Sequence, residues 1–264
     1  MIYSKETPML QEEQAPTAIH LAKKYLPIQD YAVIGNLHTV ALVGKNGSID
    51  WCCLPRFDAP SVFGALLDAE KGGFFRITPL TSPGIEYKQL YLPDTNILIT
   101  RFLTPNGLGE VTDFMPIKQE GNAVNQHYLM RFIQVIHGSL TFEMICRPAF
   151  NYARDAHQLH VSEKGAIFLS GNLCLALASS LPLEEDGRGG VRVTFTLHQG
   201  QSMHFQFEGT CDEDIRPHSH SLDYYEAAFL ETKRYWQNWL ATCRYQGRWR
   251  EMVHRSALVL KLLT

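Results

Sequence analysis

Residues 38–208 form a long succession of short β-prone runs, and turn residues rather than helices separate them. Asn46-Gly47 lies between two such runs, and this dipeptide readily adopts the positive φ angles of a two-residue hairpin. Pro105-Asn106-Gly107 is a second hairpin signal. We expect strands at residues 38–43, 48–54, 74–78, 85–92, 96–104, 108–115, 127–136, 140–147, 158–163, 166–170, 173–178, 191–198 and 202–208.

This pattern predicts a mainly β fold built as an antiparallel sandwich. Tight connections favour antiparallel pairing, because parallel strands need long crossovers that are usually helical. In residues 191–198 apolar side chains alternate with Arg and Thr, which is typical of a strand that buries one face. Residues 60–68 (PSVFGALLD) are expected to interrupt the strands as a short helix or tight turn that begins at Pro60.

The hydrophobic period changes near residue 221 and becomes helical. Four aromatic side chains fall on one face of a helix that we expect to reach residue 243; they are Tyr225, Phe229, Trp236 and Trp239. Gly247 breaks this helix, and a second helix is expected to begin near Trp249. The chain therefore combines a large sandwich with a helical C-terminal part.

The final segment, HRSALVLKLLT (254–264), is apolar on nearly all sides of the expected helix. A helix of that kind belongs inside a larger helical body. Each such side chain gains roughly 1.5–3 kcal/mol from full burial. We therefore expect the segment to be a fragment of a domain that lies outside this sequence, or a surface for self-association.

Composition argues against several classes of protein. The 264 residues carry a formal net charge of −3 without a basic block, which disfavours nucleic acid and anionic membranes as partners. No apolar run reaches transmembrane length and no signal core is present. Six cysteines without a C-x-x-C pair are no disulfide framework, so we expect a reduced, cytoplasmic protein. Cys52 and Cys53 have no cationic neighbour, so core packing is their expected role.

Two histidine pairs are the candidates for metal binding. His218 and His220 follow an acidic run, and His157 and His160 lie three residues apart. Both pairs are expected on loops or at a loop-to-strand passage, without a matching ligand pair elsewhere, so we predict no metal site. The chain also lacks a P-loop and a G-x-G-x-x-G fingerprint, and we predict no cofactor.

Carboxylates and one rigid loop are the candidates for sugar chemistry. Glycoside hydrolysis needs two carboxyl groups at a defined separation. Four acids occur at strand ends or turns, where such residues commonly bond their own backbone; they are Asp50, Asp58, Glu110 and Asp113.

The segment LPRFDAPSVF (54–63) places Arg56, Phe57 and Asp58 between two prolines. These side chains could contact a sugar, or Arg56 and Asp58 could form an internal clasp that closes the sandwich end. We select Arg56, Phe57 and Asp58 as candidate substrate-binding residues, with Trp51 behind them on the strand.

Four blocks of the sequence resemble glycoside hydrolase family 15, the bacterial and archaeal glucoamylase and trehalase-like proteins. They occur in the same order as in that family. The blocks are YLPIQDYAVIGNLHTVALVGKNGSIDWCCLPRFDAPSVFGALLD (25–68), YLPDTNILITRF (91–102), GEVTDFMP (109–116) and YQGRWREMVHRSALVLKLLT (245–264). One departure is Asn151, where many members would have an acid.

The resemblance implies an N-terminal super-β-sandwich, a helical linker and an (α/α)₆ barrel. In that family the barrel hydrolyses α-glucosidic bonds with inversion, and its catalytic glutamates lie downstream of the first barrel helix. The expected organisation is a tail and short helix (1–26), the sandwich (27–215), the linker (216–246) and the start of the barrel (247–264). No residue of the chain is then catalytic, and we predict that the chain alone does not hydrolyse α-glucosides.

Two alternatives remain open at this stage. The chain could be a stand-alone carbohydrate-binding module, for which exposed aromatic side chains in a row on one sheet face would be the sign. It could also be one subunit of a split glycosidase, whose barrel is supplied by another polypeptide. In the second case the apolar C-terminal helix would be the docking surface.

Overall fold

The computed structural model describes residues 25–80, 84–117, 127–210, 217 and 221–264. The helix expected at residues 16–26 lies almost entirely outside them, and so does the pair His218 and His220. The strands are β1 (Tyr31–Gly35), β2 (Val40–Gly44), β3 (Ser48–Cys53), β4 (Ser61–Phe63), β5 (Phe74–Pro79), β6 (Glu86–Tyr91), β7 (Leu98–Thr104), β8 (Gly107–Phe114), β9 (His127–Arg147), β10 (Gln158–Ser162), β11 (Gly165–Ser170), β12 (Leu173–Ala178), β13 (Glu184–Glu185), β14 (Val191–His198) and β15 (Ser202–Thr210). The helical elements are η1 (Ile28–Asp30), α2 (Phe150–Ala153), α3 (Leu222–Leu240) and α4 (Arg250–Leu262).

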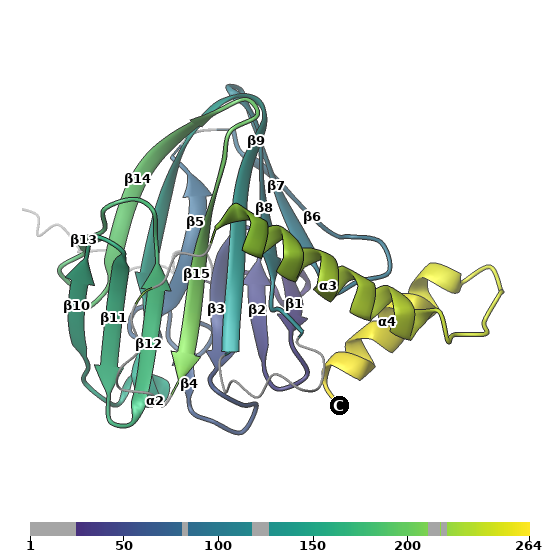
Figure 1. Ribbon diagram of the computed structural model, residues 1–264, viewed down its shortest axis with the longest axis horizontal. Helices are drawn as coiled ribbons and strands as arrows, with labels where there is room; N and C mark the ends of the chain where they lie inside the picture. The colour runs from purple at the N-terminus through teal and green to yellow at the C-terminus, as the bar shows by residue number, and fades with distance from the viewer. Residues whose placement is uncertain (1–24, 81–83, 118–126, 211–216, 218–220) are drawn as a thin grey trace, which may run out of the picture.

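The strands form an antiparallel sandwich whose two layers share the long strand β9 (Figure 1). The C-terminal half of β9 pairs with β5 and β14 in a first sheet, ordered β1-β2-β3-β5-β9-β14-β13, with β4 beside β3. Its N-terminal half pairs with β8 and β15 in a second sheet, ordered β6-β7-β8-β9-β15-β12-β11-β10. The predicted antiparallel β-sandwich is confirmed.

Two details of the strand prediction were wrong. The runs at 127–136 and 140–147 are one strand, because Gly138 (φ +77°) bends β9 from one layer into the other without ending it. Residues 61–63 form β4 rather than a helix or turn, because they pair with the end of β3. The short strands β1 and β13 were not predicted; β1 is held by β2 at the sheet edge.

Apolar side chains from both layers meet between the sheets. Phe75 of β5 and Phe207 of β15 come from opposite layers, and their ring centroids are 6.0 Å apart. Phe63 lies 5.2 Å from the same Phe207 ring. These aromatic side chains are fully buried, as expected where two inner sheet faces interdigitate.

A fully buried ion pair crosses the same interior. Arg131 on β9 donates from Nε to Asp113 Oδ1 (2.8 Å) and from Nη2 to Oδ2 (3.2 Å). Its guanidinium also donates to Phe75 O (2.6 Å) on β5 and to Gly47 O (2.7 Å) in the β2–β3 turn, both on the side of the opposite sheet. Gly47 has a φ of +79°, and a Cβ there would lie 2.2 Å from Ile77 O. Arg131 therefore ties the two layers together.

Helix α3 covers the outer face of the second sheet (Figure 1). Ser221 caps its first turn by accepting a hydrogen bond from Tyr224 N. Tyr225 packs on Phe114 and Phe132, with ring centroids 5.4 and 4.7 Å away. Farther along, the fully buried Trp236 packs with α4. None of the helices in the described residues is long and apolar enough to cross a membrane.

Helix α4 docks against the sandwich with one side only. Leu258 and Leu262 are buried in a cluster with Trp236, and partly buried side chains of β1 and β2 pack against it. Polar contacts fix the helix to the turn before β7: Asn96 Nδ2 donates to Leu258 O (3.1 Å), and Arg255 Nη1 donates to Thr95 O (2.8 Å).

The expectation that this helix is apolar on nearly all sides and unpartnered was therefore partly wrong. One stripe of α4 is buried against the sandwich, and the opposite stripe is exposed.

Candidate functional site

The loop after β3 carries three of the four predicted binding residues. Phe57 N donates to His38 O (2.9 Å), which holds the loop to the preceding turn. Arg56 binds Asp58 through two hydrogen bonds, Nε to Oδ1 and Nη2 to Oδ2, each 3.1 Å. The Arg56–Asp58 bond of the clasp alternative is therefore present, but the two side chains are 68% and 73% exposed, so the pair lies at the surface and not inside the sandwich end. An exposed pair of this kind contributes little to stability.

Trp51, the fourth predicted residue, contacts a distant part of the chain. Its ring centroid lies 6.4 Å from that of Tyr152, and the two planes are inclined by 41°. The guanidinium carbon of Arg154 lies 5.7 Å from the centre of the Tyr152 ring. Tyr152 is 41% exposed. Neither Tyr152 nor Arg154 was predicted as a site residue, because no local motif links them to Trp51.

The short element α2 brings Tyr152 to this position. Asn151, Tyr152 and Ala153 have φ values of +49°, +59° and +62°, so three successive residues are left-handed. Such a conformation costs roughly 1–2 kcal/mol per L-residue, although Asn tolerates it better than most. Ala149 N donates to Val62 O (2.8 Å), which fixes the start of the turn beside β4. Asn151 thus has a conformational role here.

Each of the four carboxylates selected from the sequence bonds to a neighbouring side chain. The pairs are Tyr31–Asp50, Arg56–Asp58, Arg101–Glu110 and Arg131–Asp113. Burial, followed by the hydrogen bond to Asp50, raises the pKa of Tyr31 above its ordinary value. Of these pairs Arg131–Asp113 is fully buried and Arg56–Asp58 is exposed, and none presents two carboxyl groups facing each other across a cleft.

His157 and His160, the second candidate pair, contact different parts of the chain. His157 Nε2 lies 2.7 Å from Gly189 O, and its ring packs between Phe150 and Phe168. His160 lies exposed on β10. In the part of the chain that the structure describes, no three His, Cys, Asp or Glu side chains are grouped so that they could hold a metal ion.

Four cysteines are buried, namely Cys52, Cys53, Cys146 and Cys174. The expected core role of Cys52 and Cys53 is confirmed. Burial raises the pKa of Cys52 and Cys146, which disfavours the reactive thiolate.

We expect a disulfide reagent to leave these four thiols unmodified in the folded chain and to modify them after denaturation, as followed by peptide mass spectrometry. Partly exposed Cys243 is the internal reference. Rapid native labelling of Cys146 would contradict this packing.

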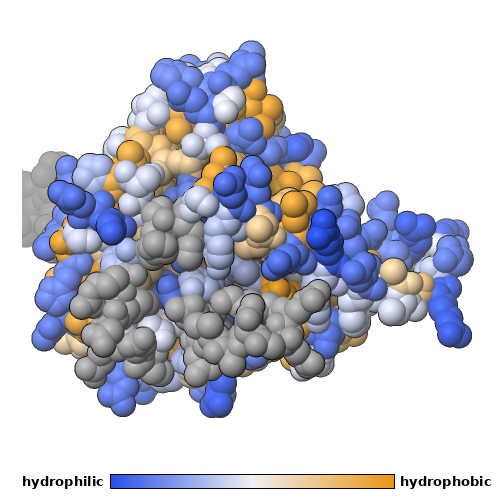
Figure 2. All heavy atoms as spheres, in the orientation of Figure 1, coloured by the Kyte–Doolittle hydropathy of each residue, from blue (hydrophilic) through white to orange (hydrophobic). Residues whose placement is uncertain are grey.

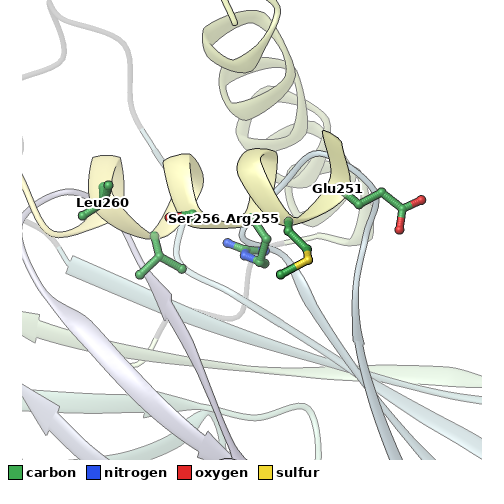
Figure 3. Close-up of a pocket in the computed structure, with 6 residues that line it drawn as sticks. Glu251, Arg255, Ser256 and Leu260 are labelled. Carbon is green, nitrogen blue, oxygen red and sulfur yellow. The ribbon is translucent and has the colours of Figure 1, made fainter. Parts of the chain in front are cut away.

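The outward side of α4 is a second candidate surface. Met252, Leu260 and Leu263 are 67%, 63% and 52% exposed. An open groove of about 580 Å³ runs along this side (Figure 3). Its lining residues are Glu251, Met252, Arg255, Ser256, Val259 and Leu260.

The loop between α3 and α4 extends this surface. It exposes Tyr245 and Trp249, and the Arg248 guanidinium lies 4.4 Å from the centre of a Trp249 ring. The face of the projecting helical hairpin in view in Figure 2 is mostly hydrophilic. Exposed Trp, Tyr, Met and Arg together are typical of protein–protein interfaces.

The chain matches one protein family, and the relatives it resembles are trehalases. The family described as "Trehalase-like, N-terminal" matches residues 20–183. A trehalase of Thermoplasma volcanium is 33% identical over 249 residues, which cover 90% of this chain and 38% of the relative. A trehalase of Mycobacterium tuberculosis is 29% identical over 269 residues, covering 92% of this chain and 38% of the relative. The chain therefore spans 38% of the length of these relatives.

A solved structure supports the same fold. A bacterial glucoamylase complexed with acarbose superposes with a TM-score of 0.59 and 12% sequence identity. The match covers 89% of this chain and 40% of the glucoamylase chain. At that identity the likeness concerns the fold alone.

Proposed function

We propose that the chain is the non-catalytic β-sandwich of an α-glucoside hydrolase. The proposal starts from its family: the chain belongs to the trehalase-like N-terminal family, which is part of the glucoamylase and trehalase type of glycosidase. In this proposal the sandwich braces an (α/α)₆ barrel, and the barrel supplies both catalytic carboxyl groups. Hydrolysis of trehalose or another α-glucoside then belongs to the whole assembly.

The observation that carries the proposal is the two-sided α4. Its inner stripe is fixed to the sandwich through Leu258, Leu262 and the contacts of Asn96. Its outer stripe leaves Met252 and Leu260 largely exposed beside an open groove. A helix that packs on one domain with one side and exposes apolar side chains on the other suits a position between two packed domains. The barrel is the partner we propose for the outer stripe, on the same polypeptide or on another.

The loop after β3 has a second part in the proposal. Arg56 and Asp58 present hydrogen-bonding groups at the surface, and Phe57 is 40% exposed beside them. We assign this loop to the mouth of the barrel's active site, where it would contact substrate. Cys52, Cys53 and Cys146 are buried thiols outside any disulfide, which supports a reducing, cytoplasmic location for the assembly.

The proposal is tested by joining and separating the two parts. One arm assays the chain alone for glucose release from trehalose, maltose and maltooligosaccharides, and we expect none. A second arm replaces the matching N-terminal region of the Thermoplasma volcanium trehalase with this chain, and we expect hydrolysis. A third arm supplies the remainder of that trehalase as a separate polypeptide, and activity on mixing would support a split arrangement. Turnover by the chain alone at enzyme-like rates would refute the proposal.

Substitution of Arg56 separates a substrate contact from a structural role. In an active assembly, we expect Arg56→Ala to lower kcat/KM at least tenfold, a loss of about 1.4 kcal/mol or more in transition-state stabilisation. Its effect on unfolding should stay within about 1 kcal/mol, because the pair with Asp58 is exposed. The matched control is Arg101→Ala, which removes a partly exposed pair elsewhere in the sandwich. Unchanged kinetics with a large fall in melting temperature would contradict the substrate contact.

A further inference from the structure

We propose that Trp51, Tyr152 and Arg154 form a binding surface for an oligosaccharide. The three side chains come from β3 and from the turn α2 with its following residue, about a hundred positions apart. The backbone hydrogen bond between Ala149 and Val62 seats that turn on the sandwich. All three residues of this surface therefore belong to the folded sandwich.

The turn presents Tyr152 at a conformational cost. Three successive non-glycine residues are left-handed, an arrangement that persists only where surrounding contacts fix it. Those contacts are present: Phe150 is 2% exposed, and Arg154 N and Asp155 N both donate to its carbonyl oxygen. The strained turn holds the Tyr152 ring at the surface. Burial of that ring therefore offsets little of the conformational free energy that the turn costs. Strain of this kind, fixed by its neighbours, is typical of ligand-binding segments.

The chemistry of the three side chains matches a sugar. Tyr152 is 41% exposed and Trp51 is partly exposed beside it, with ring centroids 6.4 Å apart, so this pair can take the C–H face of a pyranose ring. The guanidinium of Arg154 lies over the Tyr152 ring, with its carbon 5.7 Å from the ring centre, and carries five N–H donors suited to hydroxyl oxygens. Among the described residues it takes part in no ion pair, so those donors remain available.

The inclination of the rings favours one class of oligosaccharide. The planes of Trp51 and Tyr152 differ by 41°. Successive glucose units of an α-1,4-linked chain turn relative to one another, whereas a β-1,4-linked chain is a flat ribbon that would suit coplanar rings. We therefore assign the surface to α-linked glucans.

The experiment is isothermal titration of the whole chain with maltoheptaose and, in parallel, with cellohexaose. We expect millimolar binding of maltoheptaose, and a loss of at least tenfold in Tyr152→Ala. Arg154→Ala should weaken binding less, and Tyr152→Phe, which keeps the ring, should bind like the parent chain. The matched control is Trp249→Ala, which removes another exposed aromatic side chain that lies under an arginine.

Each outcome bears on the proposal. The substituted positions 152 and 154 are exposed, so these variants should fold, and melting curves verify that they do. Absence of heat with the parent chain, equal binding by Tyr152→Ala, or a loss in Trp249→Ala as large as in Tyr152→Ala would overturn the assignment. Tighter binding of cellohexaose would overturn the choice of α-linked chains. An active chimera with no maltoheptaose binding by the chain would refute this inference and leave the proposed function intact.

Discussion

Replacement of Arg131 by methionine is expected to lower the free energy of unfolding by about 3–5 kcal/mol. The side chains of Arg131 and Asp113 are both 0% exposed, so the substitution would leave a carboxylate without its partner in the core. The carbonyl oxygens of Phe75 and Gly47 would lose their donors at the same time. Since folded domains are stable by only about 5–15 kcal/mol in total, this is a large fraction of what holds the sandwich together.

Urea denaturation measures this effect through the midpoint of unfolding at constant slope. Arg101→Met is the matched control, because Arg101 and Glu110 join neighbouring strands with partly exposed side chains, and a loss within about 1 kcal/mol is expected there. The double variant Arg131→Met with Asp113→Leu should recover much of the loss, since no charge remains buried. If Arg131→Met and Arg101→Met cost the same, Arg131 does not tie the layers as inferred.

Replacement of Trp236 by alanine is expected to release the helical hairpin from the sandwich. Trp236 is 0% exposed and is the largest side chain of the cluster that joins α3, α4 and the β1–β2 edge. Truncation of a buried tryptophan costs about 3–5 kcal/mol. The contacts of the two sheets do not pass through this cluster, so we expect the helices to open while the sandwich stays folded.

Hydrogen–deuterium exchange distinguishes this local opening from global unfolding. Amides of α3 and α4 should lose protection in Trp236→Ala, and amides of β9 should keep it. Trp249→Ala is the control, because Trp249 is 52% exposed and its removal should change stability by no more than about 0.5 kcal/mol. Equal loss of protection in β9 would show that the hairpin and the sandwich unfold as one unit.

Much of the sandwich could be predicted because its determinants are local. Asn46-Gly47 specifies a hairpin by itself, and residues 191–198 reveal their buried face through alternation. The same local signal misled at Gly138, where a glycine between two apolar runs indicated a turn. In the structure that residue has a positive φ and the strand continues, because partners on both sheets are available to it.

The candidate site could be predicted only in part. Arg56, Phe57 and Asp58 occur together in a short proline-bounded segment, so composition and spacing were enough to select them. Tyr152 reaches Trp51 through a left-handed turn fixed by a bond to β4, and that placement depends on contacts distant in the sequence. For the same reason the sequence did not predict that one stripe of α4 packs on the sandwich. Leu258 and Leu262 lie against a sheet edge, and the helical pattern carries no information about that edge.

The position of β9 in the chain imposes an order on biosynthesis. Strands β1 to β5 leave the ribosome before β9, yet β5 gains its second neighbour only from residues 142–147. Until those residues emerge, the nascent first sheet ends in an unpaired strand edge, which is a template for mispairing between growing chains. Slow decoding or chaperone binding over residues 80–147 would therefore determine the yield of folded protein more than any substitution on its finished surface.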